Sequence, residues 1–307
     1  MYTNSANLPF RKILSIDFEY CGADGEVPKI VCMVIQDLRS GVVSRYWRDD
    51  LGKMNTPPFE TGEDVAIVSY FAPAEVQSML ALCWAINVSV IDLFAEFRCQ
   101  TNGDPNVGRK SLVSALQFYG LKQFVPEEKD SMRDLILSGG PLSETQRSAI
   151  LDYCQQDVIA LGPLLDAMLR HAPWSELKFN QAILRGRYMK AVGAMQHRGI
   201  PIDLDMFDKL NANWEDIKLN LIENVDAQYG VYVDGRFKEA LFQSYLARGM
   251  IPWPRLDSGR LALDRNTFSN MSKRYPIVQP LHELRKTLGE FKLNNLAVGR
   301  DGRNRTL

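Results

Sequence analysis

The sequence predicts an α/β domain with a mixed β-sheet over residues 1–172, followed by a mainly α-helical domain over residues 173–307. In the first half, short runs rich in β-branched and aromatic residues alternate with amphipathic segments, as in a sheet covered by helices. In the second half, apolar residues recur at intervals of three and four, which is typical of helices. A chain of 307 residues is long enough for about two domains.

Three β-rich runs lie near the start of the chain, at residues 13–20, 29–38 and 42–47. Arg39-Ser40-Gly41, between the last two runs, is a hairpin signal. We therefore expect three antiparallel strands, of which the first is buried.

The first of these runs carries two acids, Asp17 and Glu19. Residues two apart on a strand point to the same face, so both carboxylates would project together. Two adjacent carboxylates repel each other unless a cation lies between them. On this pair alone, a strand that runs out into solvent is an equal alternative.

Further elements follow in the first half. Residues 50–62 are rich in Pro, Gly and Thr and indicate a loop, and residues 65–71 indicate a strand. Pro73 suits the first turn of a helix that runs to about Trp84, which places Glu75 at the start of that helix. An acid there can reach a site at the sheet edge, although the helix dipole favours Glu in a first turn in any case.

The rest of this half predicts a strand at residues 88–93 and a helix at residues 110–119. Ser143-Glu-Thr-Gln146 is a capping box that opens a long helix. On that helix Tyr153 and Asp157 are four residues apart, and hence on one face. Alone, they would be interpreted as a surface pair.

This order of motifs resembles the DEDD exonucleases of the Tyr subclass, and more closely the proofreading domain of family A DNA polymerases, including phage-like members. The resemblance implies a ribonuclease H-like fold for the first domain. It also implies two Mg²⁺ or Mn²⁺ ions, held by acids that correspond here to Asp17, Glu19 and Asp157, with Tyr153 beside them.

The third acid of the motif departs from the family pattern. The family usually has an Asn a few residues before an Asp at the helix start, whereas this chain has Ser-Tyr-Phe-Ala-Pro-Ala-Glu at residues 69–75. Glu75 is the favoured replacement, as a catalytic residue and metal ligand. Asp92 is the rival candidate, at a position that is usually structural in the family.

The chemistry agrees with these residue types. Two cations about 4 Å apart can activate water and neutralise the leaving oxygen during phosphodiester hydrolysis. Mg²⁺ prefers carboxylate oxygens, and the chain has only three histidines. Its five cysteines form no Cys-x-x-Cys, so neither a zinc site nor a disulfide framework is indicated.

We hypothesise a two-metal mechanism. Asp17, Glu19 and Asp157 would hold an ion that lowers the pKa of the attacking water, and Tyr153 would orient that water. Asp17 would be the main ligand of a second ion, which stabilises the departing 3′ oxygen.

The resemblance continues in the second half. Residues 187–203 resemble the helix and turn that lead from the exonuclease into the polymerase, and residues 257–264 and 281–286 resemble thumb elements. Residues 298–307 resemble the entry into the palm. No palm or fingers follow, so polymerase activity is not expected, and the chain is either a fragment or a naturally short protein. A separate palm and fingers module is a possible partner.

Charge is distributed unevenly: residues 1–170 have 15 Lys+Arg against 22 Asp+Glu, and residues 171–307 have 21 against 15. The basic half is therefore the half expected to meet a polyanion. The candidate phosphate contacts are Arg300, Arg303, Arg305, Lys286 and Lys292. For the three arginines, a solvated chain end is an equal alternative.

The leading hypothesis is a metal-dependent 3′→5′ exonuclease that acts on DNA, with a preference for single-stranded 3′ ends. One alternative is a catalytically weak nucleic-acid-binding or polymerase-accessory module, in which the replacement of the usual Asp by Glu75 has lowered the activity. Another is an RNA-trimming exonuclease. No apolar stretch approaches the about 20 residues of a membrane span and no signal pattern opens the chain, so we expect a cytoplasmic protein.

Overall fold

The computed structural model describes residues 1–122 and 126–305. The chain forms two compact units, Met1–Pro201 with Ala297–Leu307, and Ile202–Leu296. This division differs from the boundary predicted after residue 172, because residues 173–201 and the C-terminal segment belong to the first unit. Thr306 and Leu307, at the end of the segment that resembles a palm entry, lie outside the described residues.

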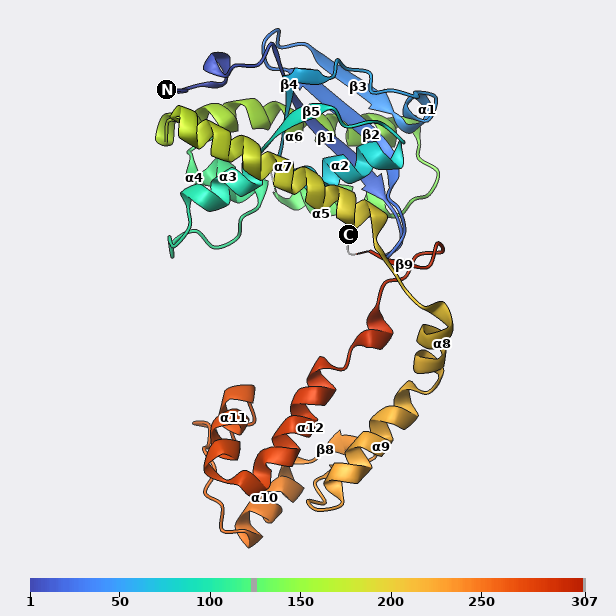
Figure 1. Cartoon of the computed structure of the whole chain (residues 1–307), viewed down its shortest axis with the longest axis vertical. Coiled ribbons are helices and arrows are strands. Elements are labelled where there is room, and N and C mark those ends of the chain that lie inside the picture. Colours follow the sequence, from blue (N-terminus) through green and yellow to red (C-terminus); the bar gives the residue numbers. More distant parts are fainter. Residues whose placement is uncertain (123–125, 306–307) are drawn as a thin grey trace. The chain divides into compact units, whose positions relative to one another are not determined.

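A five-stranded mixed sheet forms the centre of the first unit (Figure 1). Its strands are β1 (Lys12–Cys21), β2 (Lys29–Asp37), β3 (Val43–Trp47), β4 (Gly62–Ser69) and β5 (Val88–Asp92), in the order β3-β2-β1-β4-β5. β1, β2 and β3 pair antiparallel, whereas β4 is parallel to β1 and to β5. The predicted mixed sheet with three antiparallel strands is therefore confirmed.

Strand β1 is central because it pairs with β2 on one side and with β4 on the other. Its apolar residues Leu14, Ile16 and Phe18 alternate with the acids and enter one core cluster. The register between β1 and β2 shifts between Glu19 and Tyr20. A bulge of this kind bends a strand and redirects side chains, and here it lies beside the two carboxylates.

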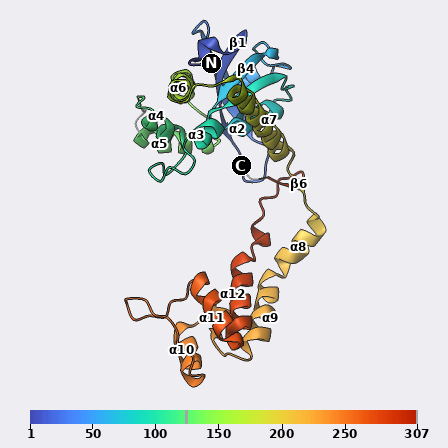
Figure 2. The ribbon, with the colours of Figure 1, turned by 60° about the vertical axis from the view of Figure 1, so that its left-hand side comes forward.

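Helices cover both faces of the sheet (Figure 2). The helices α2 (Ala72–Ala81) and α7 (Glu176–Arg198) lie on one face, and α6 (Glu144–His171) lies on the other. The long helix predicted to open at residue 143 is thus confirmed. α7 packs directly against the sheet: a Cβ at Gly186 would lie 1.8 Å from the carbonyl oxygen of Val90. This contact is why α7 belongs to the first unit.

The first unit contains further short elements. They are η1 (Ser5–Asn7), α1 (Arg48–Leu51), α3 (Leu93–Gln100), α4 (Leu112–Phe118), α5 (Pro126–Leu137), β6 (Ile200–Pro201) and β9 (Arg303–Asn304). The sequence did not predict α3 or α5. α3 follows β5 without any turn residue between them, so the usual boundary signal is absent.

The second unit is mainly helical, as predicted. It contains α8 (Leu204–Ala212), α9 (Trp214–Asp226), β7 (Tyr232–Val233), β8 (Arg236–Phe237), α10 (Glu239–Arg248), α11 (Arg265–Arg274), η2 (Pro276–Val278), α12 (Gln279–Glu290) and η3 (Leu293–Asn295). The apolar pattern after residue 203 runs on as if through a single helix, but the structure has two, α8 and α9, separated at Asn213. Among the described residues, no helix combines the length and the apolar character needed to cross a membrane.

Candidate functional site

Asp17 and Glu19 lie on β1, both half-buried. Their carboxylate oxygens and the thiol sulfur of Cys154 all lie within 4.8 Å of one another. The strand therefore brings the two acids together as the spacing of two predicted. Such proximity raises the free energy of the doubly ionised state unless a cation is shared.

Cys154 is a member of this cluster that sequence reasoning missed. It lies on α6 and is fully buried, and its sulfur is 3.5 Å from both the Asp17 carboxylate oxygen Oδ2 and the Asp17 carbonyl oxygen, which share the single thiol proton. In the sequence, only its position directly after Tyr153 could have indicated that Cys154 lies near the site. The core cluster that contains Cys154 also contains Cys32 and Val34 of β2, so it fixes α6 against the sheet beside Asp17.

Glu75 lies in the first turn of α2 and is 2% exposed. Burial, and then the charges of Asp17 and Glu19, raise the pKa of the Glu75 carboxyl well above its usual range. Its buried oxygen Oε2 has no hydrogen-bond partner among the described residues. A buried polar atom without a partner is uncommon and costly. Oε2 of Glu75 is therefore a candidate ligand atom for a cation.

The turn before α2 is strained. Phe71, the residue before the helix, has φ of 77° and lies in the left-handed region. A bulky residue rarely adopts this conformation, and such outliers concentrate at functional sites. The turn sets the start of α2, and thereby the position of Glu75.

Asp92, the rival third acid, has a different environment. It is 1% exposed, and its two carboxylate oxygens accept hydrogen bonds from the backbone N–H of Ala72 at 2.8 Å and of Ala95 at 2.9 Å. It therefore caps α3 and also holds the first residue of α2. Burial raises the pKa of Asp92 to about 6, although these N–H groups oppose the shift.

Tyr153 and Asp157 both lie on α6, four residues apart. Burial, and then the charges of Asp157, Glu19 and Asp17, raise the pKa of the Tyr153 phenol. The phenol thus keeps its proton at neutral pH and remains a hydrogen-bond donor.

A second phenol, Tyr20, was missed by sequence reasoning. Burial, and then the charges of Glu75, Asp17 and Glu19, raise its pKa. Its place on β1 directly after Glu19 was the only local signal. The site therefore has two protonated phenols beside its carboxylates.

The donor set fits hard divalent cations. The charges of Asp17 and Glu19 raise the pKa of both Glu75 and Tyr20, and Glu75 contributes to the shift of Tyr20, so the three carboxyl groups interact electrostatically. Oxygen ligands of this kind bind Mg²⁺ or Mn²⁺. In this chain the fit is supported by Oε2 of Glu75, which is buried and has no hydrogen-bond partner in the part of the chain that the structure describes.

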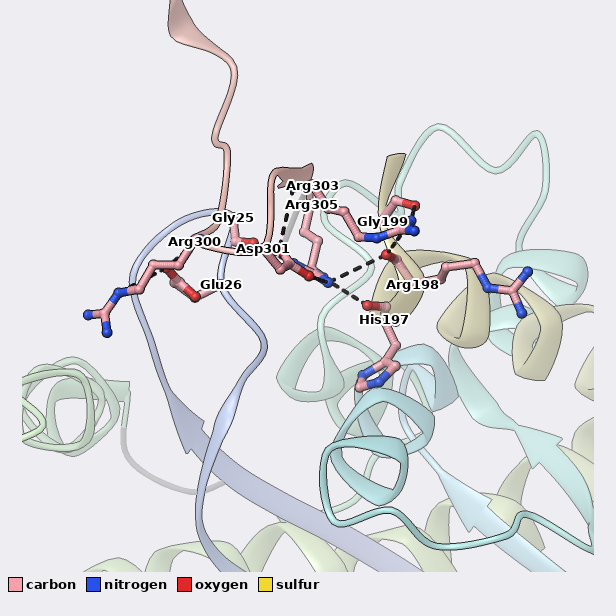
Figure 3. Close-up of polar contacts among 9 residues, drawn as sticks. All are labelled: Gly25, Glu26, His197, Arg198, Gly199, Arg300, Asp301, Arg303 and Arg305. Carbon is pink, nitrogen blue, oxygen red and sulfur yellow. Dashed lines mark hydrogen bonds and ion pairs between the residues drawn. The ribbon is translucent and has the colours of Figure 1, made fainter. Parts of the chain in front are cut away.

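The three candidate arginines near the C-terminus have different surroundings (Figure 3). Arg305 is 4% exposed, and all five of its N–H groups are used. They donate to the carbonyls of His197, Gly25 and Arg198 and to both carboxylate oxygens of Asp301. The prediction that Arg305 contacts phosphate is therefore corrected, since its guanidinium has no donor left.

Arg303 is half-buried and donates to the carbonyls of Arg198 and Gly199 at 3.3 and 3.2 Å. Arg300, by contrast, has a side chain that is 92% exposed, with only a loose ion pair of 3.6 Å to Glu26. Of the three arginines, Arg300 is the one placed to meet a ligand. Lys286 and Lys292, the other predicted contacts, lie in the second unit and are exposed.

No family model matches the sequence, and no curated protein matches it. Among solved structures, the chain is similar to the POL domain of Pol1 from M. smegmatis in complex with DNA primer-template and dNTP. The TM-score is 0.59 and the identity 14%, over 97% of this chain and 49% of that chain. The chain thus spans about half the length of that structure, and the two share a fold. Brucella melitensis NrnC bound to pGG matches with a TM-score of 0.41 and 16% identity, over 62% of this chain and 87% of that one.

Proposed function

We propose that the chain is a metal-dependent 3′→5′ exonuclease that hydrolyses phosphodiester bonds at DNA 3′ ends. The observation that carries this proposal is the environment of Glu75. Its carboxyl is buried, lacks a hydrogen-bond donor at Oε2 among the described residues, and lies within the electrostatic reach of Asp17 and Glu19. Three carboxylates gathered in this way indicate a divalent-ion site.

Asp17, Glu19, Glu75 and Asp157 are the residues that would hold two Mg²⁺ or Mn²⁺ ions. Ions bound there would lower the pKa of the attacking water and offset the negative charge on the departing 3′ oxygen. Asp92 is left out of this set because both of its oxygens accept backbone hydrogen bonds.

The phenol of Tyr153 would orient the attacking water. Its raised pKa keeps it protonated, so it can donate one hydrogen bond and accept another. Cys154 would hold the Asp17 carboxylate in place through its thiol, at 3.5 Å. These contacts fix the acid before a substrate arrives, and a ready-made arrangement of this kind is what makes a charged site effective.

We further propose that this exonuclease activity serves proofreading beside a polymerase. The similarity of fold to a POL domain that was solved with DNA primer-template supports it. Polymerase activity is not proposed, because that structure is about twice as long as this chain. A frayed single-stranded 3′ end is the substrate that suits the proposed site.

The test follows single-stranded DNA labelled at either end, with Mn²⁺ present. The wild type should release labelled mononucleotide from the 3′-labelled strand at once, and only shorten the 5′-labelled strand. Asp17→Asn should release none. The control is Asp152→Asn on the same helix as Tyr153, since Asp152 is exposed and pairs with Arg45; it should retain activity.

Four outcomes would count against the proposal. If Asp17→Asn released as much mononucleotide as the wild type, the metal site would be excluded. Early release of labelled mononucleotide from the 5′-labelled strand would exclude the 3′→5′ direction. DNA binding without any hydrolysis would favour a catalytically weak accessory module. Faster hydrolysis of a competing RNA strand would favour an RNA-trimming enzyme.

A further inference from the structure

The second unit contains a cavity of about 240 Å³ between α11 and α12. It is lined by Leu263, Arg265, Phe268, His282, Arg285, Lys286, Gly289 and Glu290. Five of these eight residues lie on α12 at helical spacing, so one face of that helix forms a wall. Three permanent cations and one carboxylate line the cavity, which is therefore net positive.

Arg285 is the central residue of this wall. Its guanidinium carbon lies 4.4 Å from the ring centre of Phe237 and 4.5 Å from that of Phe268. Contacts with two aromatic faces hold the planar group at a fixed position. One of its N–H groups donates to the Leu263 carbonyl at 3.2 Å. The guanidinium is thus placed before any ligand binds.

Arg285 also has no carboxylate partner among the described residues. Burial lowers the pKa of Arg285, and the nearby phenol of Tyr232 opposes this shift. A half-buried guanidinium usually pairs with an anion, because its five donors are costly to leave unmatched. The guanidinium of Arg285 is therefore held between aromatic rings and carries a charge that an anionic ligand can match.

Two more polar residues of α12, His282 and Lys286, line the same cavity. The Nδ1 of His282 shares a hydrogen bond of 3.3 Å with the hydroxyl of Ser272, which also bonds to the Ser269 carbonyl at 3.1 Å. Lys286, one residue after Arg285, is exposed at the mouth.

The carboxylate of Glu290 competes within the cavity. It forms an ion pair of 3.0 Å with Arg265, and both side chains are more than half exposed. An exposed pair of this kind is weak, at most about 1 kcal/mol. Arg265 can therefore exchange Glu290 for a stronger anion.

We infer that this cavity binds a phosphoryl group, with Arg285 as the fixed anchor and with Arg265 and Lys286 as the mobile contacts. A guanidinium matches two phosphate oxygens at once, which a lone ammonium cannot do. The volume exceeds the about 10–15 Å³ that one water requires, so a phosphoryl group fits together with water. The group can come from a free mononucleotide or from the backbone of a nucleic acid.

The experiment titrates the full chain calorimetrically with three probes: inorganic phosphate, a deoxynucleoside 5′-monophosphate, and a short oligothymidylate without terminal phosphate. EDTA is present throughout, so the proposed metal site cannot consume a probe. Lys286→Gln should raise the Kd for phosphate about 10-fold, the scale of one charge-assisted hydrogen bond. Glu290→Gln should lower this Kd, because it removes the competing carboxylate.

The matched control is Lys273→Gln, since Lys273 is an exposed lysine of α11 that does not line the cavity. It should leave the Kd unchanged. Glu290→Gln is the informative variant, because a gain in affinity cannot result from misfolding. If the oligothymidylate displaces phosphate, the source is a nucleic-acid backbone; if only the mononucleotide does, the source is a free monoester.

Either source would support the phosphoryl site. The inference would be overturned if the wild type bound none of the three probes, if Lys273→Gln weakened binding as much as Lys286→Gln, or if Glu290→Gln failed to strengthen it. None of these variants changes Asp17, Glu19 or Glu75. The inference is therefore tested independently of the proposed nuclease activity.

Discussion

The carboxylate of Asp92, at the end of β5, accepts a hydrogen bond of 2.8 Å from the backbone N–H of Ala72, at the start of α2. This single contact connects a strand to the helix that carries Glu75. It makes Asp92 a support for the third acid of the proposed site, and leaves Glu75 as the acid that faces Asp17 and Glu19.

Glu75→Gln should lower the rate of nucleotide release from a 3′-labelled strand by about 100-fold or more. This is the scale seen when a group that stabilises transition-state charge is lost. Asp92→Asn should lower the rate less than Glu75→Gln does, because its amide can still accept one of the two backbone hydrogen bonds. The reverse ranking of the two variants would assign the third acid to Asp92.

The stability of the first unit should depend on the protonation of Asp92. Because the pKa of Asp92 is raised from 3.8 to about 6 in the folded state, the carboxyl binds its proton more tightly when folded. Its contribution to stability is therefore full below about pH 3.8 and is lost as the pH rises through about 6, by about 3 kcal/mol.

Urea unfolding between pH 4 and pH 7 measures this contribution. The wild type should lose stability relative to Asp92→Asn as the pH rises, because the variant has no group to titrate at this position. A difference between the two proteins that stays constant over this range would contradict the raised pKa.

Mn²⁺ should stabilise the fold, since it would neutralise the repulsion among Asp17, Glu19 and Glu75. At a concentration 100 times its Kd, an ion that binds only the folded state adds about 2.7 kcal/mol to the free energy of unfolding. Thermal unfolding with and without Mn²⁺ checks this, and EDTA should reverse the effect. Asp17→Asn should abolish it, and an equal gain in that variant would place the ion elsewhere.

Arg305→Ala should lower the stability of the fold, whereas Arg300→Ala should weaken the binding of DNA. Arg305→Ala removes five hydrogen bonds and leaves buried carbonyls unpaired, so it should cost about 2 kcal/mol or more and expose the C-terminal segment to protease. Arg300→Ala should leave the unfolding midpoint unchanged and weaken binding to single-stranded DNA, most clearly at low salt. Equal stability of the two variants would contradict the structural role of Arg305.

Gly186→Ala should detach α7 from the sheet, because the added Cβ would lie 1.8 Å from the carbonyl oxygen of Val90. A loss of about 3 kcal/mol is expected, at or above the upper end of overpacking effects. Gly289→Ala, in α12, is the control: its Cβ meets nothing within 4 Å, and the better helix propensity of Ala should stabilise that helix. Denaturant midpoints of both variants provide the comparison.

Much of the fold followed from local sequence. Alternating apolar residues predicted β1 to β3, and the capping box at residue 143 predicted α6, which begins at Glu144. The break at Asn213 was not predicted, because apolar periodicity continues through it. α3 was missed because Asp92 both ends a strand and caps the next helix, so no separate boundary residue exists.

The sequence by itself determined the elements and the two acids of β1, since side-chain alternation on a strand is a local property. Only the tertiary structure decided which other groups join them. The thiol of Cys154 meets Asp17 across 137 positions, and Arg305 meets Gly25 across 280. Contacts at such separations depend on how helices and strands pack. For that reason, only the structure showed that the charges of Asp17 and Glu19 act on the buried Glu75, that Asp92 holds the starts of α2 and α3, and that Arg305 is buried.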